Sequence, residues 1–81
     1  MPYRIAITRA AAKQVKALPA SARQRVRDAI NGLADAPRPH GLKTLDAKKK
    51  LYRVRVGPIR VVFQIQDAQL VVLIIRVGDR K

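Results

Sequence analysis

The segment from residue 51 to residue 66 constrains the fold of this chain more than any other. Apolar residues alternate with polar ones on both sides of Gly57-Pro58, which predicts two antiparallel strands joined by a two-residue turn. The turn sets a register with three apolar pairs on one face: Val56–Ile59, Val54–Val61 and Tyr52–Phe63. The opposite face then carries Arg53, Arg55 and Arg60, with Arg55 directly across from Arg60.

This arginine face is unfavourable for the free protein. Like charges directly opposite each other destabilise a sheet. We therefore expect the hairpin to offer the face to an anion.

The rest of the chain predicts an α+β fold. An alternating segment, 3–8, precedes a helix over 9–17 that Thr8 can cap, and Pro19 separates it from a second helix ending near residue 34. Two apolar stripes mark the buried helix faces: Ala11, Val15 and Leu18, then Ala22, Val26, Ile30 and Leu33. Arg23, Arg25 and Arg27 lie largely off the second stripe and read as a solvated face.

The second half predicts a proline-rich loop over 35–41 and a mobile, basic loop over 42–50. Strands follow at 51–56, 59–66 and 69–77. The last strand is apolar on both faces, with Val71, Leu73, Ile75 and Val77 together, so we expect it inside the sheet. The result is one domain over 1–81 in the order β-α-α-β-β-β. Its four-stranded, antiparallel-rich sheet carries the N-terminal helical hairpin on one face.

Charge and composition point to polyanionic partners. The chain has 18 Lys and Arg against 5 Asp and Glu, for a net charge of +13, which suits RNA, DNA, an acidic protein or an anionic membrane surface. The absence of cysteine fits a reducing cytoplasm. No signal-peptide pattern is present, and the longest apolar run, Leu70–Ile75, is far short of the ~20 residues that span a bilayer. We expect a cytoplasmic protein without a membrane partner.

Several catalytic machineries are excluded by residue type. His40 is the only histidine and there is no cysteine, so a histidine-based triad or a His/Cys metal cluster cannot form. The five aspartates are scattered, and no glycine-rich phosphate loop occurs. We therefore expect neither a metal nor a cofactor, and we take His40 as an incidental surface residue.

What remains is a set of cations. The end of the last strand, beginning at Arg76, can approach the arginine face if that strand lies beside strand 59–66. Arginine forks hold phosphate oxygens and stabilise charge on a phosphoryl group, so a metal-free nuclease could use them with the ribose 2′-hydroxyl as nucleophile. Arginine is a poor general base, however, and Tyr3, Tyr52 and Phe63 fall on faces assigned to the core.

The strand sequences resemble the RelE/ParE superfamily of bacterial and archaeal toxins. The resemblance is carried by Leu51–Gly57, Ile59–Ile65 and Leu73–Arg80, with support from Leu18-Pro19 and from the loop 37–41, so it covers essentially the whole chain. It implies the toxin of a type II toxin–antitoxin pair. A RelE-like member would be a metal-free endoribonuclease that cleaves mRNA in the ribosomal A site. A cognate antitoxin, expected to be acidic, would wrap and neutralise it and repress their shared operon.

The resemblance also implies roles for single residues. Arg53 and Arg55 match the basic pair of the family's second strand. Arg60 matches the arginine that contacts the scissile phosphate, and Arg80 matches the arginine that stabilises the transition state. Other cations are expected to contact RNA: Lys48, Lys49, Lys50 and Lys81. The family usually continues past Arg80 through a catalytic tyrosine, whereas this chain stops at Lys81, so we expect the 81-residue form to be a weak nuclease.

Two other functions remain open on the sequence. A ParE-like toxin would poison DNA gyrase by binding, without cutting RNA, and a plain basic nucleic-acid-binding domain would have no catalysis. The arginine set at positions 53, 55, 60 and 80 favours the RNA-cleaving branch.

Overall fold

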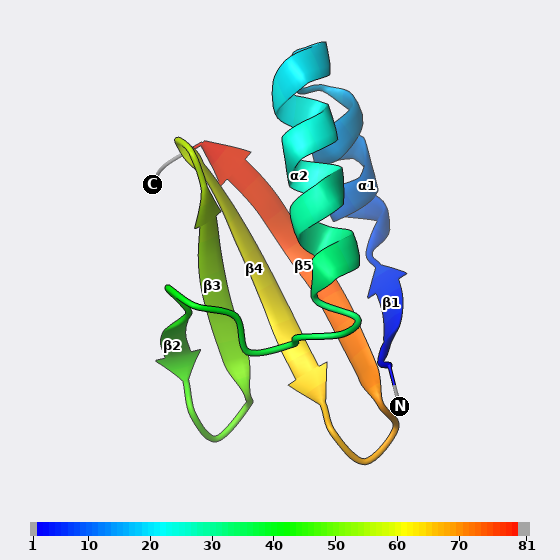
Figure 1. Cartoon of the computed structure of the whole chain (residues 1–81), viewed down its shortest axis with the longest axis vertical. Coiled ribbons are helices and arrows are strands. Elements are labelled where there is room, and N and C mark those ends of the chain that lie inside the picture. The colour runs from blue at the N-terminus through cyan, green and yellow to red at the C-terminus, as the bar shows by residue number, and fades with distance from the viewer. Residues whose placement is uncertain (1, 80–81) are drawn as a thin grey trace.

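The structure, a computed structural model, describes residues 2–79, with Asp79 described by its backbone alone (Figure 1). Seven elements follow one another along the chain: β1 (Arg4–Ile7), α1 (Arg9–Lys16), α2 (Ala20–Gly32), β2 (Lys43–Asp46), β3 (Leu51–Val56), β4 (Ile59–Gln66) and β5 (Val71–Asp79). The elements predicted from sequence lie within about two residues of these bounds, and the α+β class is confirmed. No helix among the described residues is long and apolar enough to cross a membrane.

The sheet has five strands in the order β1-β5-β4-β3-β2. β1 is parallel to β5, and the other neighbours are antiparallel. The prediction of four strands was wrong, because β2 forms inside the segment expected to be a mobile loop. This strand is short and exposed at the sheet edge, so it carries no apolar alternation. Its pairing with β3 identifies it, and the Asp46 carboxylate closes the following turn by accepting the Lys49 N–H at 3.1 Å.

The predicted hairpin is confirmed in full. Val56 pairs with Ile59, and Arg55 pairs with Arg60. Gly57 has a φ of 62°, which glycine adopts without strain. A positive φ followed by proline suits a type II′ turn, whose twist matches that of the two strands.

Helix α1 begins where predicted. The Thr8 hydroxyl accepts the N–H of Ala11 at 3.1 Å and so caps the helix. Both helices pack on the sheet face that carries Val61, Phe63 and Ile65 of β4 (Figure 1). Tyr52 lies on this face as well, with its ring centroid 6.1 Å from that of Phe63.

A bulge in β5 changes the predicted facing of its last residues. Val62 pairs with Arg76 but the next residue, Phe63, pairs with Ile74, so Ile75 is an extra residue in β5. Val77 is therefore opposite Val61 and buried in the core, rather than on the same face as Val71 and Leu73 as predicted. The same shift turns Arg76 to the face away from the helices, an outcome that strict alternation does not give.

The segment between α2 and β2 crosses the sheet on its helical side (Figure 1). It starts beside β1, where the Tyr3 N–H donates to the Ala34 carbonyl at 2.7 Å. It then passes Tyr52 of β3, over whose ring the Arg38 guanidinium lies at 5.9 Å, and Leu42 packs on the core. Within residues 2–79, the helices and the crossing segment thus cover one face of the sheet and leave the other face uncovered.

Candidate phosphate-binding face

Within residues 2–79, five cations gather on the uncovered face of the sheet, toward the end that holds the Gly57-Pro58 turn. Two rows of paired residues cross the strands there. The first row is Lys43–Arg53–Val62–Arg76, and the second is Arg55–Arg60–Gly78. We call this set the basic face: Lys43, Arg53, Arg55, Arg60 and Arg76. The structure therefore brings together the three hairpin arginines predicted from sequence and adds Lys43 and Arg76.

Sequence reasoning missed Lys43, and it expected the approach of Arg76 only if the last strand lies beside strand 59–66, as β5 does. Lys43 belongs to the edge strand that was expected to be a loop. Arg76 reaches the face through the β5 bulge, and no residue type in 71–79 marks that bulge in advance.

Arg53 shows the clearest need for a ligand. Its Nε is buried and has no hydrogen-bond partner within residues 2–79. A buried donor left without an acceptor costs about 1–3 kcal/mol, and such groups call for a functional explanation. An anion placed on the basic face would supply the missing acceptor.

Gly78 leaves room for that anion beside Arg60. It pairs with Arg60, so a side chain at position 78 would project from the same face as the Arg60 side chain. A Cβ built on Gly78 meets no atom within 4 Å. The backbone at position 78 therefore leaves open space on the Arg60 side of the face.

Three of the remaining predicted cations lie elsewhere. Lys48, Lys49 and Lys50 form the turn between β2 and β3, at the opposite end of β3 from the hairpin turn. The structure does not bring them to the basic face, and Lys50 instead donates to the Asp67 carboxylate at 3.1 Å. Arg80 and Lys81 lie outside the described residues.

Asp67 is the centre of a second polar cluster, which sequence reasoning did not find. Its carboxylate accepts two hydrogen bonds from the Arg38 guanidinium, at 2.9 and 3.3 Å, one from the Tyr3 hydroxyl at 2.5 Å, and one from Lys50. The hydrogen bonds from Arg38, then Tyr3 and Lys50, hold the pKa of Asp67 well below its usual range, and the bond to Asp67 raises the pKa of Tyr3. We call these four residues the Asp67 cluster.

The chemistry available to the two clusters differs. The basic face is cationic and suits phosphate groups. The Asp67 cluster is already satisfied internally and joins four separate segments of the chain. Neither gives a metal site, since the described residues hold no group of three His, Cys or carboxylate side chains close enough to share an ion.

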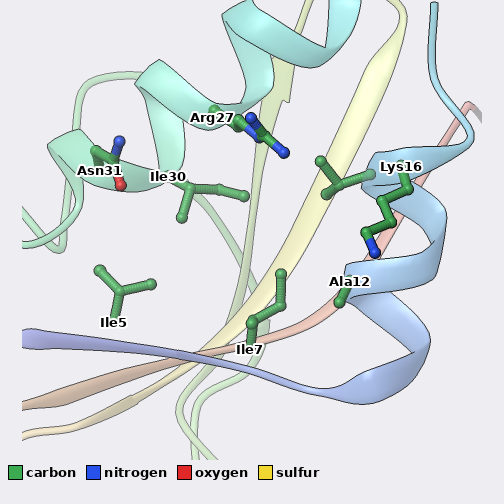
Figure 2. A pocket seen from close by; sticks show the side chains of 8 residues that line it. Ile5, Ile7, Ala12, Lys16, Arg27, Ile30 and Asn31 are labelled. Atoms are coloured by element: carbon green, nitrogen blue, oxygen red, sulfur yellow. The ribbon is translucent and has the colours of Figure 1, made fainter.

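A third feature is an apolar hollow of about 320 Å³ beside the edge strand β1 (Figure 2). Ile5 and Ile7 of β1 and Ile30 of α2 line it, and Lys16 of α1 and Arg27 of α2 bring positive charge to its border. Ile7 is 43% exposed, high for an isoleucine.

Known structures are similar to this chain in fold. RelE in the archaeal RelE–RelB complex from Pyrococcus horikoshii is 26% identical to this chain, with a TM-score of 0.89 over 99% of this chain and 97% of that one. A chain of the toxin–antitoxin complex RelBE2 from Mycobacterium tuberculosis is 26% identical to this chain, with a TM-score of 0.84 over 99% of this chain and 100% of that one. The isolated E. coli RelE toxin shares the fold. It is 22% identical to this chain, with a TM-score of 0.84 over 98% of this chain and 85% of that one.

The fold and the basic face thus define a protein of the RelE/ParE toxin superfamily. Residues 5–81 match the family described as the ParE toxin of the type II toxin–antitoxin system parDE, and the chain belongs to that family. The search of curated proteins found no match.

Proposed function

We propose that this protein is the RelE-like toxin of a type II toxin–antitoxin pair and acts in the cytoplasm as a metal-free endoribonuclease on mRNA in the ribosomal A site. The observation that carries the proposal is the buried, unpartnered Nε of Arg53 on a face where Arg55 lies opposite Arg60. A phosphodiester placed there supplies the missing acceptor and relieves the repulsion between the arginines.

The arginines would supply binding and charge stabilisation. Guanidinium groups hold the scissile phosphate and favour the extra negative charge that develops as the ribose 2′-hydroxyl attacks it. The phosphorus–O5′ bond breaks, leaving a cyclic phosphate on one fragment and a 5′-hydroxyl on the other. A proton acceptor is still needed, because arginine remains protonated at neutral pH.

The decisive experiment is induction of the protein in a bacterial host, followed by mapping of transcript ends and assay of DNA breaks. The proposal predicts slowed translation and mRNA cut within codons, at the low rate expected of a weak nuclease, with both effects lost in Arg60→Ala. Induced DNA damage with intact transcripts would instead support gyrase poisoning. This second candidate is favoured by one observation, the match to the ParE family.

A binding measurement separates catalysis from simple attraction of a basic protein to RNA. If the face only binds, Arg60→Ala should reduce the salt dependence of single-strand binding by about one contact, a slope change of about 0.7. If it cleaves, the same variant should lose activity by orders of magnitude with a small change in binding. A Lys13→Ala variant, on the exposed side of α1, controls for loss of one charge.

We further propose that a cognate acidic antitoxin neutralises the toxin and covers the hollow beside β1. Solved relatives are complexes with RelB antitoxins, and here apolar surface at Ile7 borders the cations Lys16 and Arg27. An acidic segment with apolar side chains matches both features. Ile7→Asp should weaken the complex with the co-expressed antitoxin, whereas Leu45→Asp, an equally exposed leucine on the opposite edge strand, should not. Equal effects of the two variants would argue against this location.

A further inference from the structure

We propose that Arg76 is a further RNA-phosphate contact on the basic face, and that Thr8 and Gln14 are positioning residues that hold the β5 bulge and so turn Arg76 there. This inference rests on the proposed function, because it takes the basic face as the surface that binds RNA.

The first step is the short length of β1. Its pairing with β5 ends at Ile7 opposite Ile74, yet β5 continues to Asp79. The outer edge of β5 beyond Ile74 therefore needs other hydrogen-bond partners, since an open strand edge is otherwise free to pair with another chain.

Thr8, which caps α1, and Gln14, in the last turn of α1, replace β1 along this edge. The Thr8 N–H donates to the Ile74 carbonyl at 3.0 Å, and the Thr8 hydroxyl donates to the Ile75 carbonyl at 3.1 Å. Gln14 Oε1 accepts the N–H of Val77 at 2.7 Å. These bonds hold both sides of Arg76, so the backbone around the bulge is fixed from outside the sheet.

The second step is what the bulge does to side-chain direction. Without the extra residue, Ile75 would pair with Val62 and the side chains would alternate regularly. Val77 would then face solvent, and Arg76 would face α1 and the core. With it, Val77 is 2% exposed and Arg76 is exposed on the opposite face. The bulge thus exchanges an apolar and a cationic side chain between the two faces.

The third step is the position that Arg76 gains. It lies directly across from Val62, diagonal to Arg60 at a Cα separation of about 7–8 Å, within reach of a long side chain. The row Lys43–Arg53–Val62–Arg76 crosses four strands, about 14 Å at the usual spacing between strands. Such a row suits the backbone of single-stranded RNA that lies across the strands, with Arg76 holding a phosphate next to the one at Arg53 and Arg60.

The test measures binding of a single-stranded RNA oligonucleotide across a salt series. Arg76→Ala should weaken binding and reduce the salt slope by about 0.7. Gln14→Met removes the acceptor without changing charge and should weaken binding as well. Gln14→Glu keeps an acceptor oxygen and should keep most of the wild-type affinity despite its negative charge, whereas Lys13→Ala, which also lowers the net charge by one, serves as its charge control. Far-ultraviolet circular dichroism and the Val77 amide resonance report that each variant is folded and whether the Val77 bond is lost.

A double variant decides whether Gln14 acts through Arg76. Gln14→Met should add little to the loss already caused by Arg76→Ala, because the position of an absent side chain no longer matters. The inference is overturned if Arg76→Ala binds RNA like the wild type while Arg60→Ala does not. An equal further loss from Gln14→Met in the Arg76→Ala background overturns the positioning role. Failure of the proposed function looks different, since the wild type itself would then show no RNA binding that depends on Arg60.

Discussion

The pairing of Arg55 with Arg60 places two guanidinium side chains on directly opposite residues of an antiparallel sheet. Their Cβ atoms are about 4.5–5.5 Å apart in such a pair, and like charges there are destabilising. The free protein thus tolerates a local cost at the position where we propose that phosphate binds. Stability and binding should therefore respond in opposite directions to changes at these residues.

Arg55→Thr should stabilise the free protein and weaken its binding to RNA. Removing the repulsion and placing a β-branched residue in a strand should each add a few tenths of a kcal/mol, for a total below about 1 kcal/mol. Urea unfolding measures the gain. Arg4→Thr is the matched control, because Arg4 is an exposed strand arginine that pairs with Val71 rather than with a cation. A gain as large in the control would mean that strand propensity alone explains the result.

Gly78→Val should leave the fold intact and reduce RNA binding. The site is open, with no atom within 4 Å of a built Cβ, so the new side chain fits but fills the space beside Arg60. Valine is also a good strand residue. Thermal unfolding and RNA titration of the same preparation check both parts, and Gly78→Ala should give a smaller loss. Wild-type affinity in Gly78→Val would show that phosphate does not use this opening.

At the scale of elements, the junction of β1 and α1 has two functions. Thr8 caps α1 through Ala11 and also donates its hydroxyl hydrogen to the Ile75 carbonyl of β5. One hydroxyl group thus connects the start of a helix to the bulge of a strand far along the sequence. The geometry of the basic face depends on the helices through this contact, although the helices lie on the other side of the sheet.

Thr8→Ala should destabilise the fold by about 1–2 kcal/mol, since it removes a helix cap and a bond to a strand carbonyl together. Thr8→Ser retains the hydroxyl and should recover most of that loss. Urea unfolding of both variants gives the comparison. If serine is as harmful as alanine, the methyl group of Thr8 rather than its hydroxyl is responsible.

At the scale of the whole molecule, the Asp67 cluster fastens distant segments together. Asp67 follows β4, and its partners come from the chain start, the crossing segment and the β2–β3 turn. The cluster lies at the end of the sheet away from the hairpin turn, so it stabilises the fold without neutralising the basic face.

This arrangement predicts how stability depends on pH. The pKa of Asp67 is lower in the folded protein than its ordinary value of 3.8, so the stabilisation is fully present above that value and is lost as the pH falls below it. Asp67→Asn should be less stable than the wild type at pH 7, and the difference should shrink between about pH 5 and pH 2. Melting temperatures across this range measure it. Asp35→Asn, at an exposed aspartate in the loop after α2, removes the same charge outside the cluster and serves as the control.

The predictability of this protein from its sequence follows from how local each feature is. The hairpin could be predicted with its register, because strict alternation and a two-residue turn leave one pairing. Strand β2 could not, since it is short, exposed and defined by the neighbour with which it pairs. The approach of Arg76 could be expected from the strand order, but the bulge that turns its side chain outward could not, because no residue type marks the extra residue. The Asp67 cluster could not be predicted, since its four residues meet only in the folded chain.

The parallel pairing of β1 with β5 also determines when the protein can begin to function. Arg4 pairs with Val71, so β1 cannot pair until β5 has been synthesised, 67 residues later in the chain. Contacts this distant in sequence make folding slower than in proteins with mostly local contacts. The sheet cannot be completed on the ribosome until β5 has left the exit tunnel. The pairing that places Arg76 beside Val62 forms only then. The basic face is therefore among the last parts of the protein to be assembled, because both Arg76 and the partner of β1 lie in β5.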